Sequence, residues 1–80
     1  MKKSVSKTKS MFAIEFDREV DGRWIAEIPM LPGVMAYGAT KRDVLRRVSA
    51  VALRTLADKV EHGRTPTPVS RLFDYEMAGR

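Results

Sequence analysis

The chain has 80 residues, of which 44% are hydrophobic, and a net charge of +5. This length and apolar content are enough for one small domain. It contains no cysteine and one histidine, His62. Disulfides, thiolate metal sites, multi-histidine metal cages and His–Cys catalytic pairs are therefore excluded. No apolar run approaches the roughly 20 residues that span a membrane, and no signal peptide is visible. We expect a cytoplasmic protein without a membrane anchor.

The positive charge is concentrated in residues 1–10. This segment carries four lysines and no acidic residue, whereas the rest of the chain holds eleven basic against ten acidic side chains. Such a composition predicts a disordered, solubilising tail followed by a nearly neutral domain over residues 11–76. A weak phosphate-seeking arm is the alternative function of the tail.

Two segments alternate between apolar and polar residues, as half-buried strands do. The apolar positions of residues 11–18 are Phe12, Ile14 and Phe16. Those of residues 23–30 are Trp24, Ala26 and Ile28. The sequence therefore predicts two neighbouring strands, each with one apolar face.

The connection between these strands is a hairpin at residues 20–22, and its length decides which side chains share a face. A two-residue loop would pair Phe16 with Glu27 and put the two apolar sets on opposite faces. A three-residue loop with Gly22 in the left-handed region pairs Phe16 with Ala26 and joins both sets on one face. We therefore predict the three-residue loop.

The second strand is followed by signals for a reversal and a third strand. Pro29 lacks the amide that a strand ladder requires, so it belongs at a strand end or sheet edge. Leu31, Pro32 and Gly33 predict a tight turn. Residues 33–38 then return antiparallel to the second strand.

Residues 40–63 carry the signals of one amphipathic helix. Thr40 is a suitable N-cap, and Asp43 resembles a capping box and favours the helix dipole. Gly63 ends the helix after His62. One apolar stripe runs along it, formed by Val44, Leu45, Val48, Val51, Ala52, Leu56 and Val60.

The end of the chain predicts a fourth strand over residues 69–76, after an extended segment around Pro66 and Pro68, with a frayed end at 77–80. The order β-β-β-α-β defines an α+β fold. It comprises a three-stranded antiparallel meander, a fourth strand and one helix packed on one face of the sheet.

The sheet face opposite the helix carries Ile25, Met35 and Tyr37, which is too apolar for a comfortable monomer. We therefore expect a homodimer or a higher homo-oligomer. It would pair through the edge of the third strand or through this free face.

No pattern of residues predicts catalysis. Gly33 and Gly38 are separated by a strand, so they form no phosphate loop. Ser49 and His62 are 13 positions apart on one helix, which predicts a helix-capping histidine rather than a catalytic pair. The carboxylates that could bind Mg²⁺ are scattered and predict a solvated surface: Asp17, Glu27, Asp43 and Asp74. We expect no enzyme activity, metal or cofactor.

The helix also carries four arginines outside its apolar stripe: Arg42, Arg46, Arg47 and Arg54. Acidic residues interleave with them, which predicts a solvated face. A binding face for RNA or for an acidic protein is the alternative.

Two motifs stand at a fixed spacing within residues 12–75. The segment DGRWIAEIPMLPG, at residues 21–33, joins an Asp-Gly hairpin to an aromatic residue, an Ala-Glu-Ile-Pro run and a Leu-Pro-Gly turn. The segment YGAT, at residues 37–40, then opens the amphipathic helix. Together these motifs resemble the HicB family of antitoxin-type proteins, whose fold is a truncated RNase H-like β-β-β-α-β arrangement.

The resemblance implies an interaction module without catalysis of its own. HicB-like antitoxins bind and block a small toxin, HicA, a double-stranded-RNA-binding-domain-like ribonuclease that cleaves mRNA. The RNase H name is not carried over as a function, because the carboxylate set that such a nuclease needs is not evident. Many members carry a C-terminal DNA-binding domain, and this chain stops at Arg80 without one, so we expect no DNA binding by the chain alone.

The candidate contact residues for such a toxin lie on the first hairpin and the turn that follows it. Acidic side chains there would steer a basic, RNA-binding toxin surface toward the sheet. The partner-binding candidates are Asp17, Glu19, Asp21, Glu27, Pro29, Leu31, Pro32 and Tyr37. The alternative function is a stand-alone homo-oligomer of the same fold that binds RNA weakly through its lysine tail and helix arginines.

Overall fold

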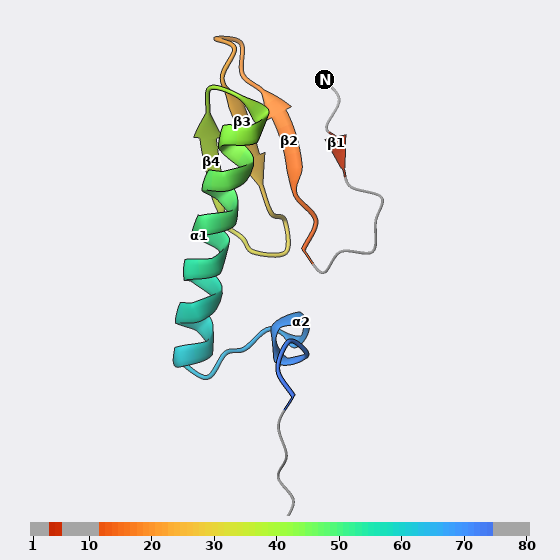
Figure 1. The fold of residues 1–80 in the computed structure, drawn as a ribbon, viewed down its shortest axis with the longest axis vertical. Helices are drawn as coiled ribbons and strands as arrows, with labels where there is room; N and C mark the ends of the chain where they lie inside the picture. Colours follow the sequence, from red (N-terminus) through yellow and green to blue (C-terminus); the bar gives the residue numbers. More distant parts are fainter. Residues whose placement is uncertain (1–3, 6–11, 75–80) are drawn as a thin grey trace, which may run out of the picture.

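The computed structural model describes residues 4–5 and 12–74. Its elements are β1 (Ser4–Val5), β2 (Glu15–Arg18), β3 (Trp24–Glu27), β4 (Met35–Gly38), α1 (Lys41–Glu61) and α2 (Thr67–Ser70). The strands form an antiparallel sheet in the order β1-β2-β3-β4, and α1 lies across one face of it (Figure 1). The predicted α+β class, the meander of β2 to β4 and the single main helix are confirmed.

The β2–β3 hairpin has the register that the apolar pattern predicts. Phe16 pairs with Ala26, and the Glu19 amide donates to the Arg23 carbonyl at 2.8 Å, which leaves a three-residue loop. Gly22 closes that loop with φ of 91°, a left-handed value that residues with a Cβ rarely adopt. The apolar residues of both strands therefore face α1.

The connection from β3 to β4 consists of two successive tight turns. The Leu31 amide donates to the Ile28 carbonyl at 2.8 Å, and the Val34 amide donates to the Leu31 carbonyl at 2.9 Å. In the second turn Pro32 precedes Gly33, whose φ is 90°, as a type II turn requires. Ile28, Leu31 and Val34 are buried where these turns meet, so the connection closes one end of the core.

The junction between β4 and α1 is close-packed. The hydroxyl oxygen of Thr40 accepts a hydrogen bond from the Asp43 amide at 3.0 Å, as an N-cap does. Gly38 lies against the first turn of the helix, where a Cβ would stand 2.8 Å from the Val44 nitrogen and 3.0 Å from its Cα. A residue without a side chain is therefore needed at this position for the helix to approach the sheet.

The carboxyl end of α1 is closed by Gly63, whose φ is 72°. The Gly63 amide donates to the Val60 carbonyl at 3.1 Å, and the Arg64 amide donates to the Lys59 carbonyl at 2.8 Å. These two bonds form a Schellman motif, which satisfies carbonyls that the helix leaves without partners.

The core lies between α1 and the part of the sheet formed by β3 and β4, the strands that the helix contacts most. The buried side chains of the described residues are Ala26, Ile28, Leu31, Val34, Val44, Val48, Ala52, Leu56 and Val69. Two members of the predicted apolar stripe, Leu45 and Val60, are 42% and 43% exposed. The sheet is narrower than the stripe, so the flanks of α1 remain uncovered.

The predicted strand at residues 69–76 is wrong within the described residues. Thr67–Ser70 form the short helix α2, and residues 71–74 contain no strand. Pro66 is extended and caps this helix, while Pro68 lies in its first turn, where a missing amide costs little. Val69 is 4% exposed and belongs to the core, so this helical turn anchors the segment that follows α1. Residues 75–76 lie outside the described part.

The edge of the sheet beside β2 is instead occupied by β1. Ser4 pairs with Phe16 and Val5 with Glu15. These two residues belong to the segment that we predict to be a disordered tail. The other residues of 1–10, and the end at 77–80, lie outside the described residues.

Candidate partner-binding surface

The sheet has one face that no element of the described chain covers. The strand pairing puts Asp17, Ile25 and Tyr37 side by side in one row and Glu15, Glu27 and Met35 in the next. These six residues define the open sheet face. Met35 is 42% and Tyr37 is 39% exposed, whereas the residues that alternate with them face α1. The open sheet face is therefore accessible to another molecule.

The open sheet face combines apolar side chains with carboxylates on β2 and β3. Ile25 and Tyr37 lie next to each other, and Asp17 lies on the other side of Ile25. Glu27 adds a second carboxylate in the neighbouring row. The guanidinium of Arg23 lies 4.6 Å from the centre of the Tyr37 ring, which is a cation–π contact at the end of this face next to the β2–β3 hairpin loop.

The tip of the β2–β3 hairpin adds further acidic groups. Asp21 accepts hydrogen bonds from the Arg23 amide at 3.1 Å and from the Arg23 Nε at 2.9 Å. These bonds, led by the one from the backbone amide, lower the pKa of Asp21. Glu19 is half-buried beside the tip, and Val20 is fully exposed. The hairpin tip is therefore a charged projection with one apolar side chain.

The turns between β3 and β4 lie at the other end of the sheet from the hairpin tip (Figure 1). Pro29 and Pro32 are exposed there, and Met30 between them is 57% exposed. Leu31 is 2% exposed. Its side chain belongs to the core, so it shapes the turns from inside and presents no surface to a partner.

The structure thus divides the eight predicted contact residues into three groups. Asp17, Glu27 and Tyr37 share the open sheet face. Glu19 and Asp21 lie at the hairpin tip, and the residues at 29–32 lie at the opposite end. Ile25 and Met35, which are not among the eight predicted residues, lie on the same face as Tyr37.

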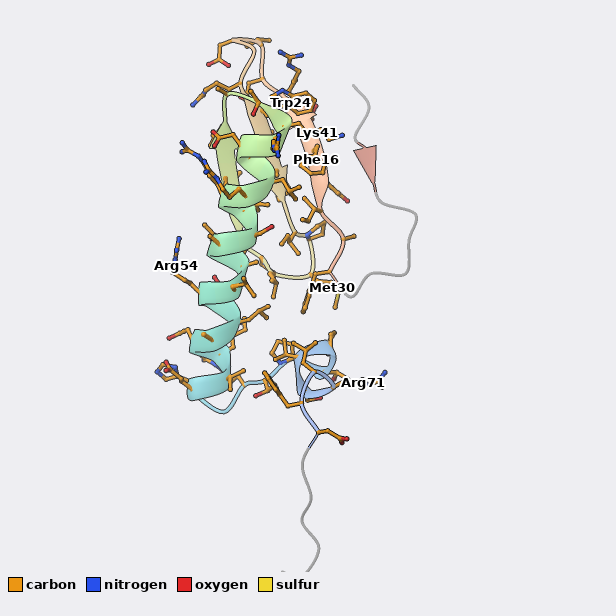
Figure 2. The ribbon with its side chains drawn as sticks, in the orientation of Figure 1. Phe16, Trp24, Met30, Lys41, Arg54 and Arg71 are labelled. Carbon is orange, nitrogen blue, oxygen red and sulfur yellow. The ribbon has the colours of Figure 1, made fainter. Side chains whose placement is uncertain are left out.

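Lys41 and Arg18 lie over aromatic rings on the helix side of the sheet. Lys41 lies beside Phe16 and Trp24 (Figure 2). Its Nζ is 4.8 Å from the centre of the Phe16 ring and 5.8 Å from that of Trp24. The Arg18 guanidinium lies 5.0 Å from the Trp24 ring. Trp24 is therefore half-buried beneath two cations rather than presented as a stacking platform, in agreement with the predicted core position.

The residues considered for catalysis do not meet. The His62 ring nitrogen lies 2.8 Å from the Asp58 carbonyl oxygen and 3.3 Å from its carboxylate, at the C-cap of α1. Ser49 lies more than three helical turns away. Within residues 4–5 and 12–74, no three histidine or acidic side chains gather as metal ligands would, and no helix is long and apolar enough to cross a membrane.

The arginines at the start of α1 are partly neutralised. The Asp43 carboxylate binds Arg46 at 2.6 Å and Arg47 at 3.2 Å. These contacts, led by the hydrogen bond from Arg46, lower the pKa of Asp43. Two of the four helix arginines considered for RNA binding are therefore already engaged by a carboxylate.

Comparison with protein-family models, with curated proteins and with solved structures gives no match to this chain. The resemblance to HicB-type antitoxins therefore depends on the two sequence motifs. The structure gives four of their residues a local role: Gly22 and Gly33 adopt left-handed backbone, Gly38 allows close packing, and Thr40 caps α1.

Proposed function

We propose that this protein is a HicB-like antitoxin module. It binds a small, basic HicA-like toxin and covers its RNA-binding surface, without a reaction of its own. The observation that carries the proposal is the open sheet face, where Asp17 and Glu27 lie beside the apolar side chains of Ile25, Met35 and Tyr37. The β-β-β-α order and the two sequence motifs support the same assignment.

The open sheet face suits a basic partner for two physical reasons. Burying its apolar side chains away from water is favourable, and a central apolar patch with a polar rim is typical of protein interfaces. Asp17 and Glu27 would meet the toxin's cations that otherwise hold RNA phosphates. This attraction speeds the encounter of the two proteins, and the toxin cannot bind this protein and RNA at the same time.

The first test is co-expression of the tagged full chain with its immediate genomic neighbours, followed by mass spectrometry of the purified complex. A stoichiometric complex with a small basic protein supports the proposal. A homo-oligomer without such a partner, with RNA binding that disappears on deletion of residues 1–10, contradicts it. That second result would favour the stand-alone RNA-binding alternative.

The open sheet face is then tested by charge reversal. The double variant Asp17→Lys and Glu27→Lys should slow association with the toxin by roughly tenfold at low salt, and the difference should shrink as salt rises. The control variant Asp58→Lys and Asp74→Lys makes the same charge change on exposed residues outside this face. Equal association rates for the two variants would rule out the open sheet face as the contact surface.

A further inference from the structure

The helix α1 is longer than the sheet that it covers. Its 21 residues extend roughly 31 Å, whereas each four-residue strand of the meander extends roughly 13 Å. The second half of α1, residues 52–61, therefore projects past the sheet toward α2 (Figure 1). Within this half Ala52 and Leu56 are buried in the core, whereas Leu53 and Val60 are 67% and 43% exposed.

An apolar groove of about 350 Å³ lies between the second half of α1 and the segment around α2. Its lining is apolar except for Glu61: Leu53, Leu56, Ala57, Val60, Val69, Leu72 and Phe73. Leu53 is 67% exposed, and Phe73 is 71% exposed. Leu53, Ala57 and Val60 have the i, i+4, i+7 spacing of one helix stripe, so α1 presents a continuous apolar seam to solvent.

Charged residues beside this seam have a spacing that matches a second copy. Arg54 and Glu61 lie seven positions apart, so they project from the same flank of α1. Among the described residues, neither makes an ion pair within its own chain. If two α1 helices pack antiparallel about a two-fold axis beside Ala57, Arg54 of each copy lies opposite Glu61 of the other. Such an arrangement satisfies four charges at once.

The small residue at the centre of the seam favours the same arrangement. Ala57 lets two helix backbones approach closely, with the larger Leu53 and Val60 on either side of it. A two-fold contact must be self-complementary, because each surface meets its own copy. An apolar seam with a small centre and opposite charges at its two ends meets this condition.

We propose that the groove is the interface of a symmetric homodimer, with a second copy of this chain as its occupant. The second halves of α1 pack antiparallel, and Leu72 and Phe73 of each copy cover the seam of the other. The groove is distinct from the open sheet face, so the dimer would leave a partner surface free on each copy. This inference does not depend on the proposed antitoxin function.

The test is the mass of the full chain in solution, measured by light scattering during gel filtration at tens of micromolar. The measured mass of the wild type should be twice the 9.0 kDa of one chain. Leu53→Glu should give a monomer, since this side chain is already 67% exposed within one copy and its replacement leaves the core intact. A monomeric wild type would overturn the proposal.

A matched control and a charge swap decide where the dimer forms. Met35→Glu puts the same charge on the open sheet face and should leave the mass unchanged. If Met35→Glu dissociates the dimer and Leu53→Glu does not, the interface is the sheet and the proposal is wrong. Arg54→Glu and Glu61→Arg should each weaken the dimer roughly tenfold, and the double variant should restore it. If the double variant does not restore the dimer, the antiparallel arrangement is wrong, whatever oligomeric state Leu53→Glu has.

Discussion

The two halves of α1 have similar apolar patterns but different surroundings. In the first half, residues 41–51, Val44 and Val48 are fully buried against the sheet. In the second half, Ala52 and Leu56 are buried as well, but Leu53 and Val60 are 67% and 43% exposed, since they lie on a flank of the helix turned away from Val44 and Val48. The apolar residues of a helix therefore show that part of its surface favours burial. They do not show whether residues of the same chain or of another molecule bury it.

The largest expected effect separates the two halves directly. Val48→Ala should lower the free energy of unfolding by about 2 kcal/mol, because it removes buried methyl groups and leaves a cavity. Leu53→Ala should change it by less than about 0.5 kcal/mol in the monomer, since an exposed side chain loses little. Urea unfolding, at a protein concentration too low for dimers to form, measures the change in unfolding free energy for both variants. Equal losses would contradict the contrast between the halves.

The junction of the first half with β4 gives the next effect. Gly38→Ala places a Cβ 2.8 Å from the Val44 nitrogen, so the helix must move away from the strand. We expect a loss of about 1–2 kcal/mol in unfolding free energy, the range of an overpacked core. Ala57→Gly, on the exposed second half, should cost about 1 kcal/mol through helix propensity alone. A Gly38→Ala variant as stable as the wild type would show that this junction is loosely packed.

The smallest effect is a pH dependence at the start of α1. The pKa of Asp43 lies below its ordinary value of 3.8, so its carboxylate stabilises the fold fully above that value. The contribution is lost as the pH falls through the lowered pKa, when the folded protein takes up the proton. Melting temperatures of wild type and Asp43→Asn should differ at neutral pH and converge in strong acid. A difference that persists there would assign the effect to something other than charge.

The hairpin and turns were predictable because a few neighbouring residues determine them. Only the three-residue loop gathers the apolar residues of β2 and β3 on one face, and Gly22 supplies the left-handed backbone that this loop needs. Thr40 and Gly63 bound α1 for equally local reasons. The open sheet face follows from the same register, so its residues Asp17, Glu27 and Tyr37 could be placed together in advance.

The prediction was wrong where distant residues decide the outcome. The pattern of residues 69–74 is compatible with a strand, but Val69 is buried with the core, residues 67–70 are helical, and residues 71–74 form no strand. Leu31 lies in an exposed-looking turn, and only the meeting of two turns with the core shows that it is buried. Neither contact has a signature in the neighbouring sequence.

The sequence by itself determined the elements that short-range physics controls: strand alternation, the hairpin register, the Pro-Gly turn, and the caps of α1. The tertiary structure alone decided which side of α1 is covered, which leaves the seam of Leu53, Ala57 and Val60 exposed. The reason is that periodicity records which side chains avoid water. Cover depends on the relative lengths and positions of elements that are far apart in the chain.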